Sequence, residues 1–416
     1  MGILNLPWFN NIRQTTNRKL FLSIVLCLAF YDSFSQTDSA FRISLILPFQ
    51  SETTTERLDT FTNAHSYFAA TKIHIDEEAI TSLDFYQGVL QAVRQSADST
   101  RIILQVYDCH NSDSITQEVL KDTAIGKSNI IIGAVSTSNS KLVAEYCKQH
   151  KIVNIQPFTP SKSLTSDNPY HLKLAPTIDS HVDALFNSIV DTFAGSNVII
   201  YTPDVDRSLT VAQRFDSLFK AYNKTAAVKF TVAFLNTKTM LLNGKKTTAT
   251  EQLKAGKTNV LIITSFDESF INGNLRLLHD DLKEKKIVVY GMPTWLSGDI
   301  LRLDYINDFN THLSDAFALD STQKETINFR AAYQSLFNVE PAKYACLGFD
   351  AMNFILSSLK DYGKDFLNNI STQHYSGTGF QFDFFKNKKG DASINYYENR
   401  FVNVFKVENY QLKKVW

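Results

Sequence analysis

The chain has 416 residues, more than one hydrophobic core usually supports, which predicts two domains or lobes. Its 42 Lys and Arg residues balance its 42 Asp and Glu residues, so a nucleic-acid-binding surface is not indicated. Apolar residues make up 44% of the chain and charged residues 20%, which is typical of a folded globular protein and excludes general disorder.

The N-terminus has the layout of a secretory signal. Basic residues between 13 and 19 precede an apolar run over 20–30, and small residues at 33 and 35 precede Gln36. The run is short for a membrane span, so we expect residues 1–35 to be a signal peptide, cleaved after Ser35 on export to the periplasm or cell envelope. A retained anchor is the alternative. Cys27 lies inside the apolar run, and the residues before it lack the small side chains that usually precede a lipidated cysteine.

Strands and helices alternate through the first part of the chain. The segment 50–78 is polar, rich in Thr and without periodicity, and is predicted to be a long loop. The helix at 83–93 is predicted to bury an apolar face, made of Leu83, Tyr86, Val89, Leu90 and Val93. Strands are predicted at 42–49, 102–107, 129–134 and 152–156, with further helices at 114–124 and 140–150.

The same alternation then begins again. Strands are predicted at 197–201, 228–234, 259–264 and 286–290, and helices at 180–193, 209–222, 251–255 and 270–285. Two helices follow, at 326–337 and 344–362, and then antiparallel strands at 379–385 and 401–407 around a turn at 388–391. The fold class is therefore α/β, with two Rossmann-like lobes built on parallel central sheets.

Ligands of open α/β sheets bind at the carboxyl ends of the strands. The turn Ser136-Thr137-Ser138 follows a predicted strand and precedes a helix, so its N–H groups and hydroxyls could hold a carboxylate. A simple N-cap for the next helix is the alternative. Five further residues follow predicted strands and are expected to contact a ligand, with core packing as the alternative for Phe158 and neighbour packing for Trp295. They are Phe158, Thr159, Ser265, Phe266 and Trp295.

The order of the motifs resembles type I periplasmic binding proteins, especially the branch that binds branched-chain amino acids and amides. The similarity rests on segments spread over nearly the whole mature chain. They are Phe85-Tyr86-Gln87-Gly88, Tyr107-Asp108, the turn from Gly133 to Ser138, Ile155 to Thr159, Gly348-Phe349-Asp350-Ala351 and the closing hairpin from Gly377 to Asp391.

This resemblance implies two lobes joined by a three-segment hinge. We expect the chain to cross near Pro176, near 312–316 and near 372–377. Lobe one would then hold residues 41–175 and 317–371, and lobe two residues 176–316 and 372–416. It also implies a non-enzymatic binding protein that closes on a small ligand, amino-acid-like or otherwise polar, for transport or sensing, with a membrane transporter or envelope protein as partner.

The second lobe departs from the amino-acid-binding branch. That branch has an aromatic-Gly pair after the strand matching 197–201, and an acid that holds the ligand ammonium. The segment 202–208 has no such pair here, and Asp204, Asp206 and Asp267 are acids without a convincing match. Recognition of free α-amino acids is therefore not predicted. The alternative function is an envelope protein-interaction module that kept the fold without a small-molecule ligand.

No catalytic or metal-binding arrangement is predicted. Cys109 and His110 are adjacent on an extended segment, so their side chains should point apart. The histidines lack metal-binding spacing, and neither a GxSxG elbow nor a phosphate-binding loop is present. We therefore expect no enzyme activity, no cofactor and no metal. We also expect free thiols at Cys109, Cys147 and Cys346.

Overall fold

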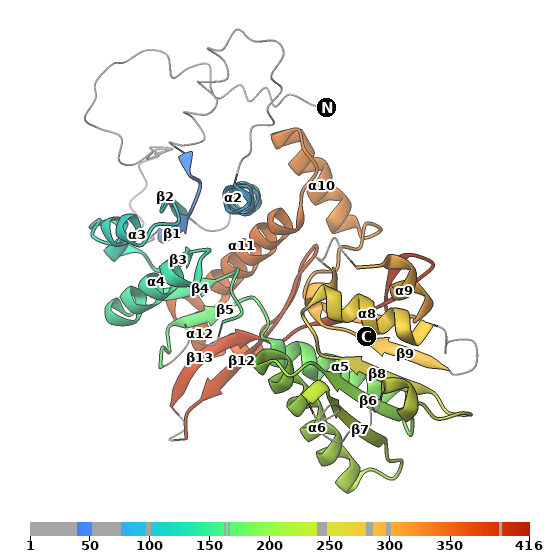
Figure 1. The fold of residues 1–416 in the computed structure, drawn as a ribbon. Coiled ribbons are helices and arrows are strands. Elements are labelled where there is room, and N and C mark those ends of the chain that lie inside the picture. Colours follow the sequence, from blue (N-terminus) through green and yellow to red (C-terminus); the bar gives the residue numbers. More distant parts are fainter. Residues whose placement is uncertain are drawn as a thin grey trace.

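Two α/β lobes with mostly parallel sheets make up the described part of the chain, which confirms the predicted fold class (Figure 1). The structure is a computed structural model that describes residues 40–51, 76–96, 101–161, 164, 167–238, 248–279, 286–296, 301–390 and 393–416. The predicted signal peptide, Cys27 and most of the predicted loop at 50–78 lie outside these residues.

The first sheet combines strands from the start of the chain with strands from near its end. Its order is β11-β12-β13-β5-β4-β3-β1-β2. β1 to β5 and β13 run parallel, whereas β12 pairs antiparallel with β11 and β13. The strands are β1 (Phe41–Leu47), β2 (Ile102–Asp108), β3 (Ile130–Gly133), β4 (Val153–Gln156), β5 (His171–Lys173), β11 (His374–Ser376), β12 (Gln381–Lys388) and β13 (Ile394–Asn399).

Helices cover both faces of this sheet, which explains why β1 ends in a continuous apolar run, Leu45-Ile46-Leu47. Leu45 and Leu47 pack in the core shared with the helix at 77–95, whereas Ile46 packs with Val143 on the opposite face. The helices of the first lobe are α2 (Glu77–Gln95), α3 (Asp113–Val119), α4 (Thr137–His150), α10 (Lys324–Phe337), α11 (Lys343–Tyr362) and α12 (Phe366–Asn369), with single 3-10 turns at Ile125–Lys127, Gly363–Asp365 and Ile370–Thr372.

Helices α2 and α11 lie side by side and touch through two glycines (Figure 1). A Cβ on Gly88 would lie 2.0 Å from the carbonyl oxygen of Ala345. A Cβ on Gly348 would likewise lie 2.0 Å from the carbonyl oxygen of Phe85. Only glycine at both positions allows the two backbones to approach this closely.

The predicted buried face of α2 was wrong in its orientation. Leu83 is 44% exposed, although Val89 is fully buried as expected. Tyr86, Leu90 and Val93 are only half-buried. The contact with α11 selects small side chains, so the buried face contains Ala79, Ser82, Phe85, Gly88, Val89, Gln91 and Ala92.

The second sheet has the order β15-β14-β10-β9-β8-β6-β7, with β6 to β10 parallel and β14 antiparallel to β10 and β15. Its strands are β6 (Asn197–Thr202), β7 (Thr231–Asn236), β8 (Asn259–Ile263), β9 (Ile287–Tyr290), β10 (His312–Asp315), β14 (Asn403–Glu408) and β15 (Gln411–Lys414). Its helices are α5 (Ile178–Thr192), α6 (Asp206–Thr225), α8 (Glu268–His279) and α9 (Leu303–Asp308), with 3-10 turns at Ala249–Gln252 and Pro293–Leu296.

The end of the chain differs from its predicted arrangement. The sequence assigned 372–416 to lobe two, but β11, β12 and β13 belong to the first sheet, and β12 and β13 lie beside β5 in Figure 1. Phe382 and Phe384 of β12 pack against Phe354 of α11, with ring centroids 5.7 and 4.9 Å apart. The strand at 381–388 pairs with β13 rather than with 401–407, so the third crossing lies at 400–402 instead of 372–377.

None of the helices formed by the described residues has the length and apolar character needed to cross a membrane.

Candidate functional site

The carboxyl edges of the two parallel sheets meet where the chain crosses between them. The first crossing leaves β5 and enters α5, where His181 Nδ1 lies 3.0 Å from Ser314 Oγ of β10. The second crossing leaves the carboxyl end of β10, and the third leaves β13, which is parallel to β5. Every strand end that the sequence singled out for ligand contact lies on one of these two edges.

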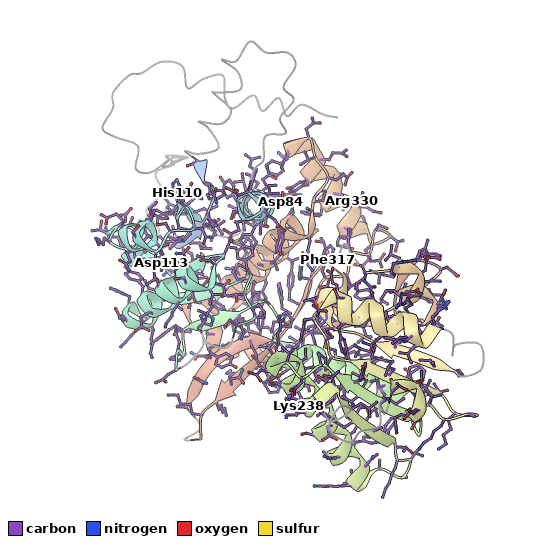
Figure 2. All side chains as sticks on the ribbon, in the orientation of Figure 1. Asp84, His110, Asp113, Lys238, Phe317 and Arg330 are labelled. Atoms are coloured by element: carbon purple, nitrogen blue, oxygen red, sulfur yellow. The ribbon has the colours of Figure 1, made fainter. Side chains whose placement is uncertain are left out.

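The three crossing segments are bonded to one another. Asn399 is fully buried, and its amide nitrogen donates to the carbonyl oxygen of Leu174 at 3.1 Å. Asn403 donates in the same way to the carbonyl oxygen of Asp315 at 3.3 Å. Phe317, which lies between the lobes in Figure 2, packs against Phe380 with ring centroids 5.3 Å apart and ring planes tilted by 41°. These contacts link the crossings into one hinge.

The hydroxyl turn forms the N-terminus of α4, as predicted, but most of its polar groups bond to the protein itself. Ser136 is the N-cap, and its Oγ accepts the N–H of Asn139 at 3.3 Å. Ser138 Oγ donates to Asp113 at 2.6 Å, and Asn139 Nδ2 donates to the other oxygen of that carboxylate at 2.7 Å. Thr137 is exposed. Asp113, labelled in Figure 2, therefore places a protein carboxylate beside the turn, bonded to two of its side chains.

Phe158 and Thr159 follow β4 and are both half-buried. Their N–H groups donate to Oε1 of the buried Gln156, at 2.9 and 3.4 Å. The ring of Phe158 lies 5.0 Å from that of Phe85 and 5.9 Å from that of Tyr344. Phe158 thus packs on the first core, as the core-packing alternative predicted, and part of its surface stays exposed at the edge, where ligand contact remains a prediction.

In the second lobe, Trp295 is a core residue rather than the wall of a cleft. It is 5% exposed, and its indole N–H donates to the carbonyl oxygen of Ser265 at 3.1 Å. A Cβ on Gly291 would lie 2.4 Å from the Trp295 ring, so the indole lies flat on that glycine. Ser265 is fully buried, and its Oγ accepts the N–H of Asp267 at 3.0 Å. The aromatic surface that remains at this edge belongs to the half-buried Phe266.

Two of the three acids considered for an ammonium group are already engaged. Asp204 lies 3.6 Å from Lys238 Nζ and accepts from Asn236 Nδ2 at 3.2 Å. Asp267 accepts the N–H of Phe270 at 2.7 Å and thereby caps α8. Asp206 is exposed in the first turn of α6, where the helix dipole stabilises its charge.

Sequence reasoning missed the residues that join the lobes at this edge. Lys343 at the start of α11 forms an ion pair with Asp315 at 3.0 Å. Burial raises the pKa of Tyr344, with smaller contributions from the charges of Glu77 and Asp315. Neither residue gave a signal in the sequence. Asp315 is the last residue of β10, a four-residue strand that was not predicted, and Lys343 opens a helix that looked purely structural.

Arg207 was also missed. Its guanidinium lies over the ring of Phe266, 3.8 Å from the ring centroid, which joins the residues after β6 to those after β8. The pair lies on the carboxyl edge of the second sheet. An Arg in the first turn of a surface helix gives no sequence signal, because the stacking depends on the pairing of β6 with β8.

The geometry offers little for covalent or metal chemistry. Cys109 is fully buried, and burial raises the pKa of its thiol to about 11. His110 lies 3.4 Å from Asp108, which also accepts N–H groups from Phe49 and Ser51. Within the described ranges, the cysteines at 109, 147 and 346 are free and buried, and no group of three or more His, Cys, Asp or Glu side chains could hold a metal ion.

Comparison with known proteins agrees with this architecture. The model of a family described as periplasmic binding protein matches residues 79–397. Similar solved structures include an ABC-type branched-chain amino acid transporter from Rhodopseudomonas palustris, with 11% identity, coverage of 90% of this chain and 96% of that chain, and a TM-score of 0.60. A branched-chain amino acid ABC transporter periplasmic ligand-binding protein from Burkholderia xenovorans has 11% identity, 90% and 94% coverage, and a TM-score of 0.58.

An ABC transporter substrate-binding protein from Desulfitobacterium hafniense, in complex with Leu, has 13% identity, covers 91% of this chain and 100% of that chain, and gives a TM-score of 0.54. At such identities the likeness to these structures shows the fold alone. No curated protein sequence matches the chain.

Proposed function

Because the chain belongs to the periplasmic binding protein family, we propose that it is an exported solute-binding protein that closes by hinge motion on a small ligand, for transport or sensing. The observation that carries this proposal is that the carboxyl edges of the two parallel sheets meet at one hinge, whose crossing segments are hydrogen-bonded to one another. Rotation about such a hinge brings the two edges together over a ligand, and a membrane transporter or receptor can read the closed form.

The ligand-contacting residues that we propose are those at the two edges. In the first lobe they are Ser136, Thr137, Ser138, Phe158 and Thr159. In the second lobe Phe266 supplies the contact surface, while Ser265 and Trp295 support it from the core. Thr137 is the best candidate for a direct polar contact, because it is exposed while Ser136 and Ser138 are already bonded to the protein.

Export is part of the proposal. Residues 1–35 would be removed as a signal peptide, so the mature chain would begin at Gln36. N-terminal sequencing of protein recovered from the cell envelope tests this. A sequence that still includes the apolar run at 20–30 would show that the segment is retained.

The direct test of function is a search for the ligand. Purified protein is denatured, and the small molecules that it releases are identified by mass spectrometry. A ligand present at 100 times its Kd should stabilise the folded protein by about 2.7 kcal/mol, which a thermal melt detects. A matched experiment on Thr137→Val should show binding weaker by about 1–3 kcal/mol with little change in stability. Protein that releases no ligand and responds to no solute would instead favour an envelope protein-interaction module.

A further inference from the structure

Lobe one carries a negative charge where a ligand carboxylate was expected. Asp113 accepts from Ser138 Oγ and Asn139 Nδ2, so its two oxygens take donors of the α4 turn that a ligand carboxylate would use. A second carboxylate there would lose those donors and meet a like charge. A ligand carboxylate is therefore disfavoured at this turn, while the exposed Thr137 stays open to an uncharged polar group.

Lobe two carries a positive charge at the corresponding edge. The guanidinium carbon of Arg207 lies over the ring of Phe266, 3.8 Å from the ring centroid, and Arg207 itself is exposed. Stacking fixes the plane of the guanidinium while leaving its N–H donors directed outward along the rim. A rim of this kind matches the two oxygens of a carboxylate.

The other charges of this edge are largely internal. Asp204 pairs with Lys238, and Asp315 pairs with Lys343. Asp206 and Asp267 flank the stacked pair, with Asp267 capping α8. The half-buried Phe266 and Phe270 pack on the second core and provide apolar surface beside the guanidinium. Among the described residues Arg207 has no ion-pair partner, so its charge attracts a carboxylate attached to an apolar chain and repels an ammonium group.

We propose that Arg207, held flat on Phe266, binds the carboxylate of an organic-acid solute that lacks an α-ammonium group. This inference rests on the proposed solute-binding function and specifies its ligand class. The polarity of the site is then the reverse of that expected for an α-amino acid, with the acidic end in lobe one and the basic end in lobe two.

Three compounds that share the same 3-methylbutyl chain test the proposal. L-leucine carries both charges, 4-methylpentanoate lacks the ammonium group, and 3-methylbutylamine lacks the carboxylate. Binding of each to the full mature chain is measured by calorimetry and thermal melts. We expect 4-methylpentanoate to bind most tightly, and Arg207→Gln to weaken its binding at least about tenfold through loss of a charge-assisted hydrogen bond.

Lys224→Gln is the matched control, because it removes the same charge from the last turn of the same helix, α6. Its binding of 4-methylpentanoate should equal that of the parent. Tighter binding of L-leucine or of the amine, no binding of 4-methylpentanoate, or equal binding by Arg207→Gln and the parent would each overturn the inference. If a different solute is released from the purified protein in such a case, solute binding stands and only the ligand class is wrong. If no solute is released or bound, both proposals fail.

Discussion

The contact between α2 and α11 allows a sharp test of the packing, through the substitution Gly88→Ala. Gly88 lies inside α2, where alanine adopts the same backbone conformation and has the better helix propensity. Any loss of stability must therefore come from the added methyl group. That methyl would lie 2.0 Å from the carbonyl oxygen of Ala345 and 2.8 Å from the backbone nitrogen of Phe349.

The size of the effect follows from these distances. A carbon and a carbonyl oxygen in contact lie about 3.3–3.6 Å apart, so the helices must separate by more than about 1 Å at this point. The contacted atoms are backbone, which cannot rotate away. Opening a gap of about 1 Å forfeits a quarter to a half of the dispersion energy of the atoms that line it, including the fully buried Phe85 and Val89. We expect the free energy of unfolding to fall by about 3 kcal/mol, which is at the upper end of the range for overpacked cores.

Urea denaturation followed by circular dichroism measures this loss. Gly273→Ala is the matched control, because Gly273 lies inside α8 and a Cβ there would meet nothing within 4 Å. It should stabilise the protein by about 0.5–1 kcal/mol through helix propensity alone. If Gly88→Ala is as stable as the parent, the close approach of the helices does not exist as described.

Three further substitutions or conditions test the hinge and the buried polar groups. Asp350→Asn should lower the free energy of unfolding by about 2–4 kcal/mol in denaturant titrations. The carboxylate accepts three backbone N–H groups from 378–380, and an amide would turn a donor toward them. Unchanged stability would contradict this. Asn399→Asp replaces the donor to the carbonyl oxygen of Leu174 with an acceptor. It should therefore lower the melting temperature and widen the separation of the lobes measured by small-angle scattering. An unchanged scattering profile would refute the role of Asn399 in the hinge. Burial lowers the pKa of three histidines far below 6.5, so the unfolded chain binds protons before the folded chain does as the pH is lowered. The free energy of unfolding should therefore fall between pH 6.5 and about 4, by up to roughly 1.4 kcal/mol per pH unit for each histidine. A flat stability profile over this range would show that they are not buried as neutral rings. The histidines are His171 (to about 3), His181 (to about 4) and His312 (to about 4).

Patterns local in sequence predicted the fold well. Continuous apolar runs such as the one ending at Leu47 marked strands covered on both faces, and their alternation with helices implied parallel sheets. The end of the chain was harder, because β13 pairs with β5, more than 200 residues earlier in the chain. Its sequence, Ile394 to Asn399, contains two Tyr and three polar residues and does not stand out as a strand.

The candidate site was predicted in position but not in its contacts. The strand ends were found because a parallel sheet places its carboxyl ends on one edge. Which groups remain open to a ligand depends on pairs from distant segments, such as Asp113 with Ser138 and Arg207 with Phe266. Trp295 illustrates the same limit. It looked like an exposed aromatic in the sequence, but Gly291 has no side chain, and this leaves room for the Trp295 ring in the core.

The interleaving of the two sheets sets an order for folding during synthesis. The parallel strands β6 to β10 come from one continuous stretch, so the parallel part of the second sheet can assemble once residue 315 has been made. The first sheet begins earlier but still lacks β12 and β13, and α11, which covers one of its faces, has not yet been made. The parallel core of the lobe that starts the chain is therefore completed after that of the second lobe, although β14 and β15 are added to the second sheet last of all. The apolar strands of the first lobe need protection from aggregation until residue 399 has been added.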